Sequence, residues 1–352
     1  MRAVTIEGRV VGPDAPTYVI AEAGPNHEGD LATAERMVVA AAKAGAHAIK
    51  FQTYEAGKLA TRTAPKYWVD PNDLHRTQYE AFKQTDTFGM KEWRHLKRVA
   101  DGEGITFLSS AWDEDSVDML DELGVAAFKI GSADITALPL LRHCASKGKP
   151  IILSTGASTL AEIATAVSAL REAGCERIIL LHCILSYPTQ TKDACLLMLR
   201  GLQEVFVDIP VGYSDHTYAD ATMTVPLAAA ALGARMIEKH FTFDKSRPGY
   251  DHYHSMDPED LAKLMNGLAV MHAAMGTEKY RNPIPAEGAA RRLARRSVVA
   301  KMDIPRGCVI TREMLTYKRP GTGISAADLD RVVGRRAATD IAEDSVITWE
   351  DV

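Results

Sequence analysis

Two histidines follow short apolar runs in the second half of the chain, and each lies two residues beyond another polar side chain. Ser214 and His216 end one run, and Glu238 and His240 end the other. Side chains alternate along a strand, so the members of each pair share one face. Two imidazoles at neighbouring strand ends can hold a divalent metal and leave positions for water or substrate. A simpler interpretation is that each histidine only caps its strand by hydrogen bonding.

Two lysines, Lys50 and Lys129, also end apolar runs. Serine hydroxyls occupy comparable positions, at Ser132, Ser154 and Ser214. A lysine supplies a positive charge and a serine a short hydrogen-bond donor, so together they suit a phosphate or carboxylate. A lysine in a barrel can instead form a Schiff base, but that chemistry needs no metal. The histidine pair therefore favours a metal site beside an anion site.

Glu22 is the one acid at a strand end early in the chain, and a Gly-Pro-Asn-His turn follows it at 24–27. A carboxylate there can stabilise a developing positive charge or handle a proton. An ion pair with one of the two lysines is compatible with either role. Asp251 follows a flexible loop and is a candidate for orienting a sugar hydroxyl or a metal-bound water. The roles of Arg247 and His252, in the same loop, stay open.

These residues need a scaffold that gathers distant strand ends, and the chain repeats a unit of apolar strand and amphipathic helix. We expect strands at 18–23, 48–52, 106–109, 127–130, 151–154, 178–182, 211–213 and 236–241. We expect helices at 31–44, 92–102, 115–123, 138–146, 159–173, 219–232 and 258–275. In one of them, Thr159 and Glu162 have capping-box spacing. This alternation implies right-handed crossovers and a parallel sheet.

Eight such units predict an α/β fold, a (β/α)8 TIM barrel, with a doubly wound open sheet as the competing arrangement. Polar residues follow the strands at Glu22, Lys50, Gln52, Ser109, Ser110, Lys129, Ser132, Ser154, His182, Ser214, His216, Glu238 and His240. In an open sheet, strands at opposite edges could not share a site. Because a closed barrel brings all eight ends to one mouth, the polar residues favour the barrel.

The segment 55–88 interrupts this rhythm with Tyr67, Trp68, Asn72 and a short helix predicted at 74–83. We expect it to cross over the barrel mouth, although a packed surface insertion would have a similar sequence.

The barrel domain is expected at 1–276, after a short ribbon at 3–11, and a linker with a basic helix follows at 277–296. A second domain at 297–352 contains a near-repeat, in which Asp303-Ile304 and the residues after it are echoed from Asp340-Ile341 onward. This predicts a small pseudo-symmetric β domain, too small to be more than marginally stable alone.

The composition is that of an ordinary globular protein: the 352 residues are 46% hydrophobic and 25% charged, with a net charge of -5. This charge argues against nucleic acid or an anionic membrane as partner. The five cysteines include no CxxC pair, so they read as reduced thiols. Without a signal-peptide pattern or an apolar run long enough for a membrane span, we expect a cytoplasmic protein.

An ordered set of motifs resembles the sialic acid synthase family. The motifs are AEAGPNHEGD (21–30), IKFQTY (49–54), FKIGS (128–132), ILSTGAS (152–158), LLHC with YPT (180–189), VGYSDHT (211–217), IEKHF (237–241) and HSMDP (254–258). In the tail, KRPGTGIS (318–325) resembles that family's C-terminal antifreeze-like domain, the β-clip SAF domain. The resemblance covers nearly the whole chain and is specific as an ordered set.

The resemblance implies condensation of phosphoenolpyruvate with an N-acylated mannosamine-type sugar and water, giving N-acetylneuraminate or a related nonulosonate plus phosphate. It implies that His216 and His240 bind a divalent ion, expected to be manganese, with magnesium or cobalt also able to serve. Glu22 would stabilise positive charge while water adds. The residues implied to hold the phosphate of phosphoenolpyruvate are Lys50, Lys129, Ser132, Ser154 and Ser214, with Gln52 and Ser110 near its carboxylate. Further substrate contacts are expected from Asn72, Asp134, Tyr187, Asp251 and Arg319.

The resemblance also implies a homodimer in which the antifreeze-like domain of one subunit closes the barrel of its partner, with Arg319 contacting the acyl-amino sugar.

Two departures fall on the sugar side of the site. Ile184 and Leu185 stand where neuraminate synthases usually have polar residues, and Asp134 stands where a glutamate is common. These departures leave room for a legionaminate- or pseudaminate-type synthase that uses a 2,4-diacetamido-6-deoxyhexose. Two further hypotheses compete with the synthase. One is a non-catalytic sugar-binding relative, and the second is an enzyme that makes a shorter keto-deoxy sugar acid from a phosphorylated aldose.

Overall fold

The computed structural model describes residues 1–68, 75–277 and 280–352. They form two compact units, Met1–Met275 and Gly276–Val352. Within the described residues, no helix has both the length and the apolar character needed to cross a membrane.

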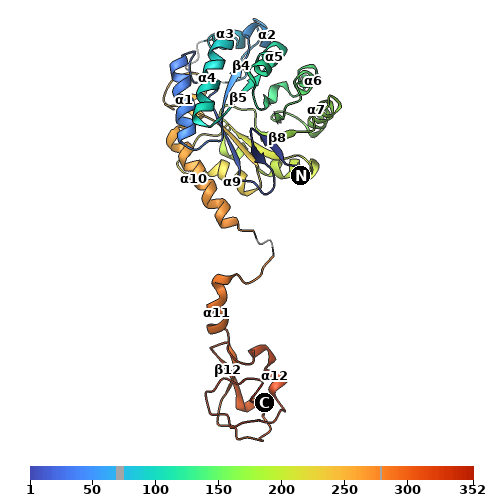
Figure 1. Ribbon diagram of the computed structural model, residues 1–352, viewed down its shortest axis with the longest axis vertical. Coiled ribbons are helices and arrows are strands. Elements are labelled where there is room, and N and C mark those ends of the chain that lie inside the picture. Colours follow the sequence, from blue (N-terminus) through green and yellow to red (C-terminus); the bar gives the residue numbers. More distant parts are fainter. Residues whose placement is uncertain (69–74, 278–279) are drawn as a thin grey trace. The chain divides into compact units, whose positions relative to one another are not determined.

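The first unit is a closed barrel of eight parallel strands surrounded by helices, which confirms the predicted fold (Figure 1). Strands adjacent in the chain pair with one another, and the last strand closes onto the first. The barrel strands are β3 (Tyr18–Glu22), β4 (Ala48–Thr53), β5 (Thr106–Ala111), β6 (Phe128–Ile130), β7 (Ile151–Ser154), β8 (Ile178–Cys183), β9 (Val211–Asp215) and β10 (Met236–His240). The competing open-sheet arrangement is wrong.

The helices outside the barrel are α1 (Leu31–Lys43), α4 (Met90–Glu103), α5 (Glu114–Leu123), α6 (Leu138–Ser146), α7 (Leu160–Glu172), α8 (Leu197–Val205), α9 (Thr224–Ala231) and α10 (Pro258–Met275). Helix α8 was not predicted. Helix α9 begins later than predicted because the side chain of Asp220 accepts hydrogen bonds from the amides of Thr222 and Thr224 and holds the preceding residues in a turn. The predicted capping box is confirmed, since Thr159 and Glu162 exchange hydrogen bonds.

The two faces of the strands pack into separate layers. Outward-facing residues such as Ile49 and Phe51 join the helices in one large apolar cluster. Inward-facing residues form a second cluster with the amino-terminal hairpin of β1 (Val4–Ile6) and β2 (Arg9–Val11). This inner cluster contains Val4, Ile6, Val11, Tyr18, Ile20, Ala48, Leu108, Ala127, Ile152, Ile179, Leu181 and Met236. It fills the amino-terminal half of the barrel, so polar side chains can project only at the carboxyl end.

The segment between β4 and α4 contains α2 (Ala56–Leu59) and α3 (Gln78–Lys83). Helix α3 begins later than predicted because Thr77 caps it, accepting a hydrogen bond from the amide of Glu80. Asn72 lies outside the described residues.

The second unit contains helix α11 (Gly288–Leu293), the antiparallel pair β11 (Ser297–Ala300) and β12 (Leu315–Lys318), and helix α12 (Leu329–Val332). Helix α11 carries Arg291 and Arg292 and lies within the range 277–296 that the sequence predicts as a linker.

The predicted pseudo-symmetry of the second unit is confirmed by reciprocal hydrogen bonds between its halves. The backbones of Ile304 and Ile341 bond to each other in both directions, at 2.8 and 2.9 Å. The amide of Arg306 donates to Asp340 (2.7 Å), and in the equivalent contact the amide of Glu343 donates to Asp303 (2.8 Å). Each half therefore supplies the other's backbone partners.

Candidate active site

Every barrel strand follows the same inward alternation, which explains why the polar residues meet. On β3, Tyr18 and Ile20 belong to the inner apolar cluster, and Glu22 is the next inward residue. On β4 the corresponding step leads from Ala48 to Lys50. The same spacing places Ser110, Lys129, Ser154, Ser214 and Glu238 at the carboxyl end of the barrel, where they line one cavity.

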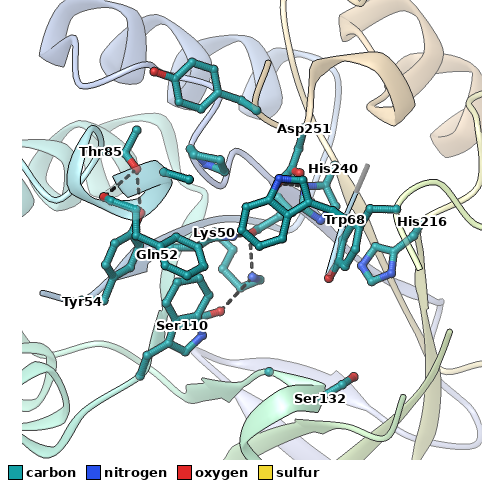
Figure 2. A pocket seen from close by; sticks show the side chains of 18 of the residues that line it. Lys50, Gln52, Tyr54, Trp68, Thr85, Ser110, Ser132, His216, His240 and Asp251 are labelled. Carbon is teal, nitrogen blue, oxygen red and sulfur yellow. Dashed lines mark hydrogen bonds and ion pairs between the residues drawn. The ribbon is translucent and has the colours of Figure 1, made fainter. Parts of the chain in front are cut away.

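The cavity has a volume of about 470 Å³. Figure 2 shows His216, His240 and Asp251 on one side of it, Tyr54 and Thr85 on the other, and Lys50 between them. Of the sequence-predicted residues, those lining it are Glu22, Lys50, Gln52, Ser110, Lys129, Ser132, Ser154, Tyr187, Ser214, His216, His240 and Asp251.

Glu22 and Lys50 form a buried ion pair, with Nζ 2.6 Å from Oε2. Lys50 also donates to the hydroxyl of Ser110 at 3.0 Å, and the side-chain amide of Gln52 donates to Glu22 at 2.9 Å. The expected ion pair of Glu22 with a lysine is thus present. The carboxylate is fixed on both oxygens and cannot rotate away from the cavity.

Glu238 joins the two lysines. Its Oε1 lies 3.7 Å from Nζ of Lys50 and 3.6 Å from Nζ of Lys129, and it accepts a hydrogen bond from Ser214 at 3.2 Å. The sequence places Glu238 at a strand end, but it was not among the predicted site residues. The signal was present, since Glu238 shares a face with His240 on β10. The ammonium groups of two buried lysines thus lie close to the same carboxylate oxygen.

Burial and neighbouring charges act differently on these four groups. Burial raises the pKa of Glu22 although Lys50 opposes it. Burial disfavours the charge on Lys50, but Glu22 and Glu238 hold its pKa above the ordinary value. Burial lowers the pKa of Lys129, and Glu238 only partly offsets this. The two lysines hold the pKa of Glu238 down against its burial. Lys129 is therefore the less compensated cation, and an anion that approaches it gains most.

Two serines complete the donors around the lysines. The hydroxyl of Ser154 is buried and has no hydrogen-bond partner in the described structure. The hydroxyl of Ser132 accepts from the amide of Gly156 at 2.9 Å and also hydrogen-bonds the side chain of Cys183. A Cβ on Gly156 would lie 2.9 Å from that hydroxyl, so the close approach requires glycine.

The histidines are oriented by their Nδ1 atoms. His216 Nδ1 lies 2.9 Å from the carbonyl oxygen of Ile184, and His240 Nδ1 lies 3.1 Å from Oδ2 of Asp251. Their ring centroids are 5.4 Å apart, and Tyr187 packs 4.2 Å from the ring of His216. A partner on Nδ1 fixes the ring and leaves Nε2 to bind a metal. The donor set therefore fits a divalent cation.

The residues between these inward pairs hold the two strands together from outside. Asp215 and Lys239 face away from the cavity and form a fully buried ion pair at 2.8 Å. Lys239 also donates to the carbonyl oxygen of Thr217 at 2.6 Å. The pair ties the end of β9 to β10, and so fixes the spacing of the two histidines.

The loop before α10 adds a third histidine that sequence reasoning missed. His254 is fully buried in a short 3₁₀ turn, and a ligand atom of its ring lies within 4.8 Å of ligand atoms on His240 and Asp251. In the same loop, Glu28 pairs with both Arg247 (2.8 Å) and His252 (3.1 Å), whose roles the sequence left open. Those two residues brace the loop.

Asn26 positions Asp251 and does not face the cavity. Its side-chain amide donates to the carbonyl of Phe241 (2.9 Å) and to Ser255 (3.0 Å), while its oxygen accepts from the amide of Asp251 (3.1 Å).

Three residues near the predicted mouth face elsewhere. His182 hydrogen-bonds the carbonyl of Ala194, Ser109 bonds Thr53, and His27 stacks on Phe88.

Asp134 is half-buried beside the cavity wall, and a Cβ on Gly131 would lie 3.5 Å from its carboxylate. Arg319 belongs to the second unit, directly after β12.

Aromatic side chains form the outer wall of the cavity, and they confirm that the segment 55–88 reaches it. Tyr54 stacks on Trp112 with centroids 4.7 Å apart, and Phe82 packs 5.7 Å from the same indole. Tyr67 and Trp68 also line the cavity.

Comparison with known proteins identifies related chains. The NeuB family model matches residues 37–280, and the SAF domain model matches residues 295–352. An N,N'-diacetyllegionaminic acid synthase of Legionella pneumophila is 38% identical over 349 residues, which are 97% of this chain and 96% of that protein. An N-acetylneuraminate-9-phosphate synthase of Homo sapiens is 35% identical over 97% of this chain and 94% of that one. A crystal structure of an N-acetylneuraminic acid synthetase from Leptospira borgpetersenii, in complex with citrate, has a TM-score of 0.73 and 35% identity, covering 82% of this chain and 95% of that one.

Proposed function

Because the chain belongs to the NeuB family, we propose that it is a nonulosonic acid synthase of the sialic acid synthase class, which condenses phosphoenolpyruvate with an N-acylated amino sugar and releases phosphate. The observation that carries the proposal is the convergence of two buried lysines on one point beside two oriented histidines. A barrel mouth with these groups can bind a phosphorylated acid and a carbonyl compound side by side.

Phosphoenolpyruvate binds with its phosphate at Lys129 and Lys50, with hydroxyl donors from Ser132, Ser154 and Ser214. The unpartnered hydroxyl of Ser154 supports this assignment, since a buried donor without a partner is costly unless a ligand satisfies it. Gln52 and Ser110 lie next to Lys50 and suit the carboxylate end of the same substrate.

His216 and His240 hold the divalent metal, with Asp251 orienting His240. Manganese is the expected ion. When bound, the metal supplies a Lewis acid that polarises the open-chain aldehyde of the sugar.

The chain's own residues then carry the reaction. The C3 atom of phosphoenolpyruvate forms a bond to the aldehyde carbon, which leaves positive charge at C2. The carboxylate of Glu22, held 2.6 Å from Lys50, stabilises that charge. Water adds to C2, and one of its protons goes to the former aldehyde oxygen. The tetrahedral intermediate then breaks its C–O bond to phosphate and forms the C2 carbonyl. The remaining hydroxyl proton leaves with the phosphate, whose charge Lys50 and Lys129 stabilise.

The acceptor is an unphosphorylated sugar. Among the described residues of the barrel, Lys50 and Lys129 are the only lysines or arginines that line the cavity, so the barrel offers no further lysine or arginine to a second phosphate. This disfavours a phosphorylated aldose. The aromatic wall of Tyr54, Phe82 and Trp112 favours apolar substituents. It thereby supports a second candidate acceptor, a 2,4-diacetamido-6-deoxyhexose, which would make the enzyme a legionaminate- or pseudaminate-type synthase.

The active unit is a homodimer in which the SAF domain of one subunit covers the barrel of the other. The match of residues 295–352 to the SAF domain supports this arrangement. Arg319 then contacts the acyl-amino group of the sugar bound in the partner's barrel.

The test is phosphate release from phosphoenolpyruvate by the purified, chelator-stripped protein. N-acetylmannosamine, its 6-phosphate and a 2,4-diacetamido-6-deoxyhexose are each supplied with and without manganese. We expect manganese-dependent release with one unphosphorylated sugar, and a drop of about 10²-fold or more in the Glu22→Gln variant. Metal-independent release, or release with the 6-phosphate alone, would contradict the proposal. No release from a protein that binds manganese and phosphoenolpyruvate would favour a sugar-binding relative.

A further inference from the structure

His254 is a buried histidine without a visible task. Its side chain is fully inaccessible to solvent, and neither ring nitrogen has a hydrogen-bond partner in the described structure. Buried polar groups in native proteins are nearly always satisfied, and each unsatisfied one costs roughly 1–3 kcal/mol. An apolar side chain would avoid that cost. The imidazole therefore points to a partner that binds at this place.

The loop itself does not need the His254 imidazole. Its neighbour His252 is equally buried, but the Nδ1 of that ring lies 2.7 Å from Thr242 Oγ1 and its Nε2 lies 3.1 Å from Glu28. Asn26 and Ser255 anchor the same turn through the backbone of Asp251. Other residues thus hold the turn, and the imidazole of His254 makes no hydrogen bond that would stabilise it.

The surroundings of His254 are those of a metal site. Ligand atoms on His240, Asp251 and His254 all lie within 4.8 Å of one another. Ligands at about 2.0–2.2 Å from one ion are at most about 4.4 Å apart. A small movement of the side chains brings the three groups to that spacing. The ring of His254 is 4.8 Å from that of His240 and 6.2 Å from that of His216, centroid to centroid.

We propose that His254 is a third imidazole ligand of the divalent metal, so that His240, Asp251 and His254 bind the ion together with His216. The inference rests on the metal site of the proposed function and adds two protein ligands to it, the imidazole of His254 and the carboxylate of Asp251. A set of three nitrogens and one carboxylate prefers ions that bind imidazole well, such as cobalt, over magnesium, which prefers oxygen. His254 thereby sets which metal the protein selects.

The test measures binding of the metal alone, without phosphoenolpyruvate or sugar. Titration calorimetry of the chelator-stripped full chain gives the affinities for cobalt and magnesium, and the visible absorption of the cobalt-loaded protein reports its ligands. We expect His254→Gln to weaken cobalt binding at least about tenfold, to change the cobalt spectrum, and to affect magnesium less. His252→Gln is the matched control: it removes a brace of the same loop but no proposed ligand, so the cobalt spectrum of this variant should stay that of the wild type.

Unchanged cobalt affinity and spectrum in His254→Gln would overturn the proposal, as would the same change of spectrum in the His252→Gln control. Thermal unfolding of the metal-free proteins checks the fold, and His254→Ala replaces the glutamine variant if that variant does not unfold cooperatively. The outcome is separate from that of the proposed function. Absence of phosphate release with every sugar contradicts the reaction, whereas a wild-type spectrum in His254→Gln contradicts only the third ligand.

Discussion

The two buried lysines of the cavity have unequal surroundings, and this gives them unequal roles. Lys50 contacts Glu22 at 2.6 Å and Ser110 at 3.0 Å, whereas Lys129 has its nearest carboxylate, that of Glu238, at 3.6 Å. Lys129 therefore has more to gain from a bound phosphate. Removal of Lys50 should destabilise the folded protein more than removal of Lys129, because it leaves the buried Glu22 without its counter-ion.

We expect Lys129→Met to weaken phosphoenolpyruvate binding by about 10–100-fold, the loss of one charge-assisted hydrogen bond, with little change in stability. Lys50→Met should in addition lower the free energy of unfolding by about 3 kcal/mol, because a buried charge loses its partner. Titration calorimetry and thermal unfolding of both variants check the difference. Equal stabilities would show that the Glu22–Lys50 pair does not stabilise the fold.

Asp134 provides a pH-dependent prediction. Burial raises the pKa of its carboxyl from 3.8 to about 6, although Lys129 opposes the shift. A raised carboxyl pKa stabilises the folded state at low pH, and this stabilisation is lost as the pH rises through the folded pKa. Asp134→Asn should match the wild type near pH 4 and exceed it above pH 6, by up to about 2 kcal/mol. Melting temperatures between pH 4 and 8 test this; a constant difference would contradict it.

The sequence predicted most of the site residues on strands, but missed Glu238 on β10 and His254 on a turn. Alternation along a strand fixes which side chains face inward, so Lys50, Ser154 and His240 could be placed without coordinates. His254 lies in a 3₁₀ turn, where no such period exists. His182 was expected at the mouth but lies on the other face of its strand, one residue from the inward-facing Leu181.

The backbone of β9 leaves no room for a side chain at Gly212. A Cβ on Gly212 would lie 2.5 Å from the carbonyl oxygen of Met236 and 2.6 Å from a methyl carbon of Leu181. Met236 and Leu181 belong to the inner apolar cluster that supports the cavity from below. The spacing of strands β9 and β10 therefore depends on the missing side chain.

Gly212→Ala should destabilise the protein by about 3 kcal/mol, because the methyl group forces the two strands apart. It should also reduce metal affinity, since the same strands carry His216 and His240. Gly201→Ala is the control: nothing lies within 4 Å of that Cβ, and alanine in helix α8 should stabilise by up to about 1 kcal/mol. Thermal unfolding and metal titration measure both effects, and a Gly212→Ala variant as stable as the wild type would contradict the argument.

Elements with a clear period were predicted well, whereas two helix starts that side-chain caps determine were placed too early. All eight barrel strands appeared within two residues of their expected bounds. Helices α3 and α9 begin later than predicted because Thr77 and Asp220 bond to backbone amides downstream. Several polar residues near a helix start could accept the hydrogen bond from the amide. Hydrophobic spacing does not determine which of them caps the helix.

In the proposed homodimer, the SAF domain of one subunit covers the barrel of the other, so each active site contains residues of both chains. Glu22→Gln disables a barrel, and Arg319→Ala disables the domain that covers the partner's barrel. Mixing the two variants and allowing subunits to exchange should restore about a quarter of wild-type activity, because half the dimers are mixed and each mixed dimer has one intact site. No restoration, with exchange verified by mass spectrometry, would contradict a shared site.

The barrel closes where its first strand meets its last, and this seam runs through the active site. Glu22 on β3 and His240 on β10 are register partners, and the amide of Phe241 donates to the carbonyl of Glu22 at 2.6 Å. During synthesis, nearly the whole barrel sequence must therefore be made before Glu22 can pair with the strand segment that carries His240. A nascent chain that lacks the final strand already holds both lysines but has no complete metal site. The barrel's own part of the active site is thus complete only when its first and last strands are paired.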